Sequence, residues 1–489
     1  MVETAIGYFG DERRGKAGEL LVERIARRQV VCLRKLGDGR AEQAKFRRFL
    51  MNDAVTVKEM VSHRAALAAR AAVGRHVLAI QDTTEINYEA QRGRKRKLGT
   101  VGNGTDVGLF VHPVLGIDAD TEQCFGLLDA YVWRRCEPKA ANYKCLPIED
   151  KESYRWVRGG AQAKAVLTEA SMITIMDDRE GDIYEKWARL PDHRTHLLTR
   201  ASRDRSLADS STTLFSTLAG LPEAHRYLLD VTAQPGKRSA RQACMAVRFG
   251  RLRICRPGNC SDPNAPQEIE LYAIEVRELD PPRGEKAICW RLVTTHTVET
   301  VAQALQVIGW YRLRWQIEQL FRTLKRQGLG IEQSVVEHGV ALEKLVIVAL
   351  IGACITMQLV LARATEGQDA PADRVFDAEE IEVLHAMQSK LQGHTAKQKN
   401  PYRLGTLAWA AWTIARLGGW TGYESERSTG PITIRDGLHR FYALVDGYRE
   451  LMIDGACRHG RQVDRKPRQF GPILLGKVAP GGGFTMKPW

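Results

Sequence analysis

The sequence predicts an α/β protein built around a mixed β-sheet with helices on its faces. Two short apolar runs support this prediction, HVLAIQDTTEINY at 76–88 and SMITIMDDREGD at 171–182. Each has the composition of a buried central strand and ends in acidic residues. Strands come first in a run and then alternate with helical segments, which is the order expected of a mixed sheet.

Residues 1–70 are expected to form an N-terminal helical domain. Asp11 is placed to cap a helix whose apolar residues recur on one stripe, and residues 46–71 add one or two further helices. The unit is basic enough to place a helix against DNA, so it is a candidate DNA-binding domain. A plain helical bundle with exposed arginines is the alternative.

The central segment, 71–363, contains the predicted sheet. GLFVHPVLGID and QCFGLLDAYVW follow the first buried strand as two more strands, and a helix is expected over roughly 154–170. HLLTRAS predicts another strand. Four β-like runs then predict a strand-rich insertion at about 206–297, after which the helical pattern returns.

One apolar stretch, 345–362, has 18 residues without a charge, the lower edge of membrane-spanning length. It contains Gly352, Thr356 and Gln358 and lacks flanking interface aromatics, so we expect a fully buried core helix and not a membrane span. Residues 364–375 have linker composition, 364–455 predict a C-terminal helical domain for dimerisation, and 456–489 predict a flexible basic tail.

The chain is strongly basic. Its 489 residues include 72 Lys and Arg against 58 Asp and Glu, a net charge of +14. Such a surplus favours a polyanionic partner, nucleic acid first and an acidic membrane surface second. The ten cysteines include no Cys-x-x-Cys pair, which argues against zinc and for reduced thiols. The N-terminus lacks a signal-peptide core, and we expect a cytoplasmic protein.

The segment WYRLRWQIEQLFRTLKRQGLG, 310–330, predicts a helix with an unusual polar face. At about 100° per residue, Tyr311, Arg314, Glu318 and Lys325 fall within roughly 60° of one another, beside a separate apolar stripe. A surface salt-bridge ladder of little energetic value is the ordinary interpretation of such a column.

Three acids from separated segments favour a different interpretation. Asp82 and Asp178 each end a buried strand, where open α/β sheets place their sites, although each could simply cap a helix. With Glu318 they provide oxygen ligands for Mg²⁺ or Mn²⁺, and two such ions can support an in-line displacement at phosphorus. The neighbouring Arg and Lys would then hold DNA phosphates.

These residues resemble the bacterial insertion-sequence transposases of the DDE type. Tyr311, Arg314, Glu318 and Lys325 match the signature Tyr-x2-Arg-x3-Glu-x6-Lys. AIQDTT, DREGD and KESYRW, with the lead-in VETVAQALQVI, the N-terminal GDERR…FRRFL region and the stretch IARLGG, also look like that family. The resemblance covers about residues 10–455.

The resemblance implies a ribonuclease-H-like catalytic core of the retroviral-integrase superfamily, with two metal ions held by Asp82, Asp178 and Glu318. It implies a DNA transposase that binds terminal inverted repeats, cuts and joins strands, and works as a homodimer on element ends and target DNA. Trp290 matches a tryptophan that stacks near a flipped base, and Arg200 matches a DNA-contacting arginine. It implies a bacterial cytoplasm, association with the nucleoid, and no membrane or small-molecule substrate.

Several alternatives stay open on the sequence. Asp177 precedes Asp178, and physics alone does not choose between them. Trp290 could belong to the core of the β insertion and Arg200 to a strand-end surface. The basic loop QRGRKRKLG, 91–99, is either solvated or a phosphate clamp. The whole protein could be a catalytically inactive DNA-binding derivative or inhibitor of transposition, or a carboxylate-based sugar hydrolase.

Overall fold

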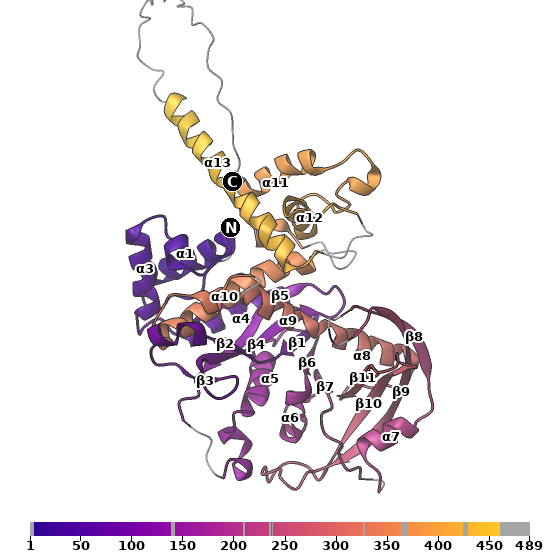
Figure 1. Cartoon of the computed structure of the whole chain (residues 1–489). Helices are drawn as coiled ribbons and strands as arrows, with labels where there is room; N and C mark the ends of the chain where they lie inside the picture. Colours follow the sequence, from indigo (N-terminus) through magenta and orange to yellow (C-terminus); the bar gives the residue numbers. More distant parts are fainter. Residues whose placement is uncertain are drawn as a thin grey trace, which may run out of the picture.

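The protein is described here from a computed structural model, which covers residues 4–137, 142–208, 211–233, 236, 238–325, 328–362, 370–423 and 429–459. The predicted α/β architecture is confirmed: one 11-stranded mixed sheet lies at the centre, with helices packed around it (Figure 1). Residues 460–489, most of the predicted tail, and 364–369 of the predicted linker lie outside the described residues.

The N-terminal segment forms four helices, of which the first and the last begin at a side-chain cap. Asp11 accepts a hydrogen bond from the backbone N–H of Arg13, and Thr56 accepts one from Glu59. These helices pack against the long apolar helix α10 (Gly339–Leu361) in Figure 1. Their bounds are α1 Glu12–Arg28, α2 Leu33–Leu36, α3 Arg40–Met51 and α4 Val57–Ala71.

The sheet runs in the order β2-β4-β1-β6-β7-β11-β10-β9-β8, and β3 and β5 also pair with β4. β1 pairs in parallel with β6, and β6 with β7; the other pairings are antiparallel. The strand bounds are β1 His76–Gln81, β2 Thr84–Asn87, β3 Gly99–Val101, β4 Asp106–Asp118, β5 Cys124–Trp133, β6 Met172–Asp177, β7 Thr195–Arg200, β8 His225–Val231, β9 Arg241–Cys255, β10 Glu268–Leu279 and β11 Cys289–Thr294.

The predicted β insertion is not a separate layer. Its last strand, β11, pairs antiparallel with β7, so β8 to β11 extend the same sheet. α7 (Leu214–Gly220) packs on β9 and β10 within this part. The residues predicted as four β-like runs are therefore strands, and their pairing places the insertion beside the carboxyl ends of the central strands.

Two layers cover the central strands. Leu78 and Ile80 of β1 face a core that contains α10, whereas Val77 and Ala79 face a second core. That second core contains α5 (Tyr154–Val166) and α6 (Tyr184–Arg189). Because both faces of β1 are buried, its sequence is a continuous apolar run and does not alternate.

β1 and β2 form one strand path with a gap at Asp82. Gln81 pairs with Val114 and Thr84 with Val111, an unchanged register that leaves Asp82 opposite Pro113. Proline has no backbone N–H, so it cannot donate to the ladder at this point. The gap in the strand at Asp82 therefore coincides with a proline in the neighbouring strand, β4.

The apolar stretch 345–362 lies in α10 and is buried, as expected for a core helix. This helix is long and apolar enough to cross a membrane by length and composition, and 89% of its most apolar window is buried within the protein. α10 contacts β5, the N-terminal helices and the C-terminal helices, so its apolar surface is covered on several sides.

The C-terminal segment is helical, as predicted. Arg27 of α1 donates a 2.8 Å hydrogen bond to the buried carboxylate of Glu380, which links this segment to the N-terminal helices. The helices are α11 Ala378–Leu391, α12 Leu407–Leu417 and α13 Pro431–His459. The domain boundaries expected from the sequence stay predictions.

One predicted helix is wrong, because the structure has two helices in its place. The segment 310–330 was expected to be a single helix, but it divides into α8 (Val301–Leu313) and α9 (Trp315–Leu324). At the junction the N–H of Arg314 bonds to the carbonyl of Tyr311, three residues back and not four. Ile317 bonds in the same way to the Arg314 carbonyl, so the chain is tightened here into a 3-10-like turn.

Candidate active site

Asp82 lies at the gap between β1 and β2, on the α9 side of the sheet. Its carboxylate accepts a 2.7 Å hydrogen bond from the Thr83 N–H and a 3.2 Å bond from the Arg314 guanidinium. Burial, together with the negative charges of Asp178 and Glu318, raises the pKa of Asp82 to about 7. Asp82 therefore lies close enough to the other two predicted acids for their charges to act on it.

Strand register brings Asp178 beside Asp82. β1 and β6 run in parallel, and Ile80 pairs with Met176, so the residues two positions later in each strand lie side by side. Asp178 keeps an extended backbone and caps a short 3-10 turn, where its carboxylate accepts the Glu180 N–H at 2.8 Å.

Asp177 faces the opposite layer, and its carboxylate is already fully occupied. It is completely buried and accepts hydrogen bonds from Gln81 Nε2 at 2.7 Å and Thr199 Oγ1 at 2.9 Å. The buried ammonium of Lys186 also pairs with it. The alternation of side chains along β6 thus places Asp178, and not Asp177, with Asp82 and Glu318.

A chain of hydrogen-bonded, largely buried side chains packs against the strand ends that carry the two aspartates. Gln81 Oε1 lies 3.1 Å from His112 Nε2, and His112 Nδ1 lies 2.9 Å from Thr83 Oγ1. Arg155 Nε donates to the same Thr83 hydroxyl at 2.7 Å. Burial holds the pKa of His112 well below its usual range, so the ring is neutral and can donate at one nitrogen and accept at the other.

The sequence drew attention to some of these supporting residues but not to others. Arg155 belongs to the KESYRW segment, whose likeness to the transposase family was visible. Gln81 and His112 had no signal of their own, because a polar residue inside an apolar strand has no partner until the neighbouring strands are placed. Lys186 was equally hidden, as a lysine in a short amphipathic helix is normally solvated.

The predicted polar column is divided between two helices. Tyr311 lies in the last turn of α8, Arg314 at the junction and Glu318 in the first turn of α9. Arg314 bonds to Asp82, and Tyr311 and Glu318 lie near the two aspartates. Lys325 follows the end of α9, and its ammonium lies 3.9 Å from Glu332. Burial lowers the pKa of Lys325, while Glu332, Glu85 and Glu318 oppose that effect.

Trp290 and Arg200 line one cavity together with Tyr311 and Arg314. The cavity has a volume of about 450 Å³ and also includes Arg312 among its walls. The rings of Trp290 and Tyr311 meet edge to face, with centroids 6.2 Å apart. Of the predicted DNA-contacting residues, only Lys325 is outside the lining of this cavity.

Two further contacts define that cavity. Arg200 donates a 2.9 Å hydrogen bond to the Cys289 carbonyl, which fixes its guanidinium next to β11. Burial lowers the pKa of Arg200 and raises that of Tyr311, whose phenol therefore stays neutral. A neutral aromatic pair flanked by cations suits a nucleobase with its phosphate.

The carboxylates of Asp82, Asp178 and Glu318 are the oxygen donors for a divalent metal. Within the described part of the chain, no three His, Cys, Asp or Glu side chains converge tightly enough to form a metal cage by themselves. Mg²⁺ needs only one or two carboxylates and takes its other ligands from water and phosphate. The oxygen donors of Asp82, Asp178 and Glu318 fit such an ion, which would relieve the repulsion that raises the Asp82 pKa.

Two comparisons with known proteins found similarities. Residues 121–354, just under half of the chain, match a family model described as "Transposase DDE domain". The matched segment includes Asp178, Trp290 and Glu318, whereas Asp82 precedes it. A cryo-EM structure of a piggyBac transposase synaptic complex with hairpin DNA is similar at a TM-score of 0.37 and 10% identity, over 88% of this chain and 76% of that one.

Proposed function

We propose that this transposase-like chain is a DDE-type DNA transposase, which binds the terminal inverted repeats of an insertion sequence and cuts and joins DNA strands. One observation carries the proposal: Asp82, Asp178 and Glu318, from three distant segments, interact at one point next to a cationic aromatic cavity. The family match to residues 121–354 supports the same chemistry.

The strand order supports a ribonuclease-H-like core for this proposed enzyme. β1 lies between antiparallel β4 and parallel β6, and β7 continues the parallel part. In that arrangement the first acid follows the first strand, the second acid follows the neighbouring parallel strand, and the third comes from a helix on the sheet. Asp82, Asp178 and Glu318 occupy these positions.

Two divalent ions, Mg²⁺ or Mn²⁺, would supply an activated oxygen nucleophile and stabilise the leaving oxygen. Asp82, Asp178 and Glu318 would hold them, which requires Asp82 to lose its proton. The Arg314 guanidinium, now on Asp82, would be free to turn to a phosphate once that carboxylate has a cationic partner.

Neither of the two proposed reactions needs an oxidant or a nucleotide. In the first, a water oxygen attacks phosphorus, the bond from phosphorus to the 3′ oxygen breaks, and a 3′-hydroxyl and a 5′-phosphate result. In the second, that 3′-hydroxyl attacks a phosphorus of another strand, loses its proton and displaces a second 3′ oxygen. If the second strand is the opposite strand of the element, the product is a hairpin end.

The remaining roles follow from position and charge. Trp290 and Tyr311 would receive a base flipped from the element end, while Arg200, Arg314 and Lys325 would hold the adjoining phosphates. Residues 1–70 would bind the terminal repeats, and the C-terminal helices would pair two protomers. The protein would act in a bacterial cytoplasm, bound to the nucleoid.

The test is release of the element from a supercoiled plasmid that carries candidate terminal repeats, in the presence of Mg²⁺. The wild-type chain should nick and release the element, and Asp82→Ala, Asp178→Ala and Glu318→Ala should each abolish release while DNA binding persists. Glu169→Gln, an exposed acid after α5, is the matched control and should be active. Binding of the repeats without nicking by wild type would identify an inactive derivative.

A further inference from the structure

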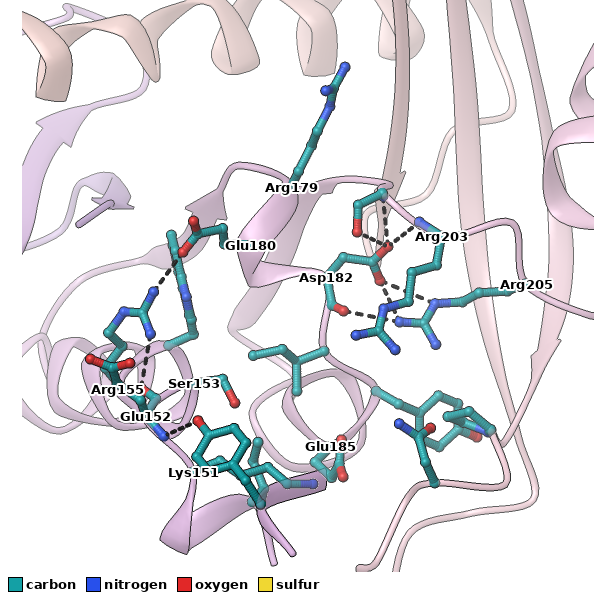
Figure 2. Close-up of a pocket in the computed structure, with 18 of the residues that line it drawn as sticks. Lys151, Glu152, Ser153, Arg155, Arg179, Glu180, Asp182, Glu185, Arg203 and Arg205 are labelled. Atoms are coloured by element: carbon teal, nitrogen blue, oxygen red, sulfur yellow. Dashed lines mark hydrogen bonds and ion pairs between the residues drawn. The ribbon is translucent and has the colours of Figure 1, made fainter. Parts of the chain in front are cut away.

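A second cavity, whose lining includes six basic and four acidic residues, adjoins Asp178, whose carboxylate accepts the N–H of the lining residue Glu180. It has a volume of about 440 Å³ and is formed by the start of α5, the turn after β6 and the loop after β7. Figure 2 shows Lys151 and Arg155 on one side of it and Arg203 and Arg205 on the other, while Arg179 points away. Both strand-end acids lie next to residues that border this cavity.

The two cavities belong to one hollow band. Arg200 and Trp290 are shared between the Trp290 cavity and the next hollow, and Arg179 and Arg200 continue into a third. Arg179 and Ser202 then border the second cavity. At its far end, Arg155 bonds to the Thr83 hydroxyl, one residue after Asp82. The two cavities are thus linked through shared basic lining residues. Each includes a residue bonded to one of the acids, Arg314 to Asp82 and Glu180 to Asp178.

Two cations of the second cavity, Lys151 and Arg203, are available to a ligand. Their side chains have no hydrogen bond or ion pair with any residue in the described ranges. Arg155 is committed, because its side chain is 10% exposed and bonds to Glu180 and to the Thr83 hydroxyl. Arg205 is likewise committed to the buried carboxylate of Asp182.

The lining favours a phosphodiester backbone over a base. Of its three aromatic side chains, Trp156 and Tyr184 are buried at 0% and 1% exposure. The third, Tyr143, is half-buried, and its hydroxyl accepts a 2.8 Å hydrogen bond from the Glu152 N–H. Arginine and lysine side chains bind phosphate irrespective of base identity. The Trp290 cavity has the opposite character, because two aromatic rings form its wall.

We propose that the second cavity holds the phosphate backbone of the target DNA while the Trp290 cavity holds the element end. This inference rests on the proposed function. Joining requires two DNA strands to approach one set of carboxylates. The two cavities provide a separate surface with basic residues for each strand. A seat that contacts only phosphates suits DNA accepted without regard to sequence.

The experiment uses the full-length protein with pre-cleaved element ends that carry a free 3′-hydroxyl, so joining is measured apart from cutting. The double variant Lys151→Ala with Arg203→Ala should reduce joining to a plasmid target about tenfold. The slope of log target affinity against log salt concentration should become shallower by about 2, since each phosphate contact contributes about 1. Cutting of uncleaved ends should stay at the wild-type rate.

The matched control is Lys390→Ala with Lys397→Ala, which removes the same charge from exposed positions in the C-terminal helical segment, at the other end of the molecule in Figure 1. Joining at the wild-type rate by the Lys151 and Arg203 variant would overturn the inference, as would an equal loss of cutting and joining. A wild-type chain that never cuts element ends would contradict the proposed function itself, a different result from a failure of target capture alone.

Discussion

The side-chain amide of Gln81 donates a 2.7 Å hydrogen bond to the buried carboxylate of Asp177. Gln81 precedes Asp82 and Asp177 precedes Asp178, so this bond joins the ends of the two parallel strands at the point where both proposed metal ligands emerge. Gln81 also bonds to the Trp156 carbonyl, and Asp177 pairs with Lys186. The relative position of the two acids is therefore held by a buried polar network.

Breaking the buried ion pair should destabilise the protein strongly. Lys186→Met leaves the Asp177 carboxylate buried without its cation, which costs about 3–5 kcal/mol of unfolding free energy. Urea unfolding at neutral pH would measure this loss. Thr199→Val, which removes only one hydroxyl from the same carboxylate, should cost about 1–3 kcal/mol and serves as the graded control.

At the same site, the effect of the ion pair on stability can be measured separately from its effect on the relative position of Asp82 and Asp178. The double variant Lys186→Met with Asp177→Leu replaces the pair by apolar groups, so much of the lost stability should return. Gln81 then loses its carboxylate partner, and strand cleavage should stay low at limiting Mg²⁺. Full recovery of cleavage with stability would show that the network only stabilises the fold.

The raised pKa of Asp82 predicts a pH-dependent stability. Between the ordinary pKa of an aspartate and about 7, the folded protein binds a proton that the unfolded chain has released. The unfolding free energy should therefore fall as pH rises through this window. Asp82→Asn, which has no proton to lose, should flatten this part of the pH profile. An identical slope in wild type and variant would contradict the assignment.

Divalent metal should act on the same carboxylate in the opposite direction. Because a bound cation favours the ionised form, Mg²⁺ should lower the Asp82 pKa and raise thermal stability most at pH 7 and above. Half-maximal cleavage should need less Mg²⁺ as pH increases from 6 to 8. Asp82→Asn should show no such metal-dependent stabilisation.

Arg314 should tune that titration. Its positive charge opposes the rise in the Asp82 pKa, so Arg314→Gln should move the stability and Mg²⁺ profiles to higher pH. Arg322→Gln is the control on α9, since Arg322 is exposed and stacks over Trp315. If both variants shift the pH profiles equally, the cause is the general loss of positive charge and not the contact between Arg314 and Asp82.

Trp290 should contribute stacking energy to a flipped base. Trp290→Ala should weaken binding of an element end with an unpaired terminal base by about 1–3 kcal/mol, and Trp290→Phe should keep part of that energy. Fluorescence of 2-aminopurine at the unpaired position would report stacking directly. Trp315→Ala, in the same cavity but 47% exposed, is the control expected to have the smaller effect. Equal losses of binding in the two variants would show that Trp290 is not the specific stacking partner of the base.

Local sequence patterns were sufficient to predict most of the elements. β1 and β6 were visible as apolar runs because strands buried on both faces have continuous hydrophobic sequences, and α10 because it is apolar all round. The caps Asp11 and Thr56 act within three residues, so they too depend on neighbours in the chain. The candidate acids Asp82, Asp178 and Glu318 stood at ends or faces of these elements.

Other features depend on partners that are distant in the chain. Both faces of β6 are apolar, so its sequence has no mark of which face meets α9; the parallel register with β1 decides for Asp178. The gap at Asp82 lies opposite Pro113 on β4, and two helices that meet at Arg314 replace one that looked continuous. The sequence alone determined most of the elements and the candidate acids, because these depend on short-range backbone and side-chain preferences. Only the tertiary structure decided which carboxylate lies beside Asp82, because that depends on strand register and on which layer covers each face.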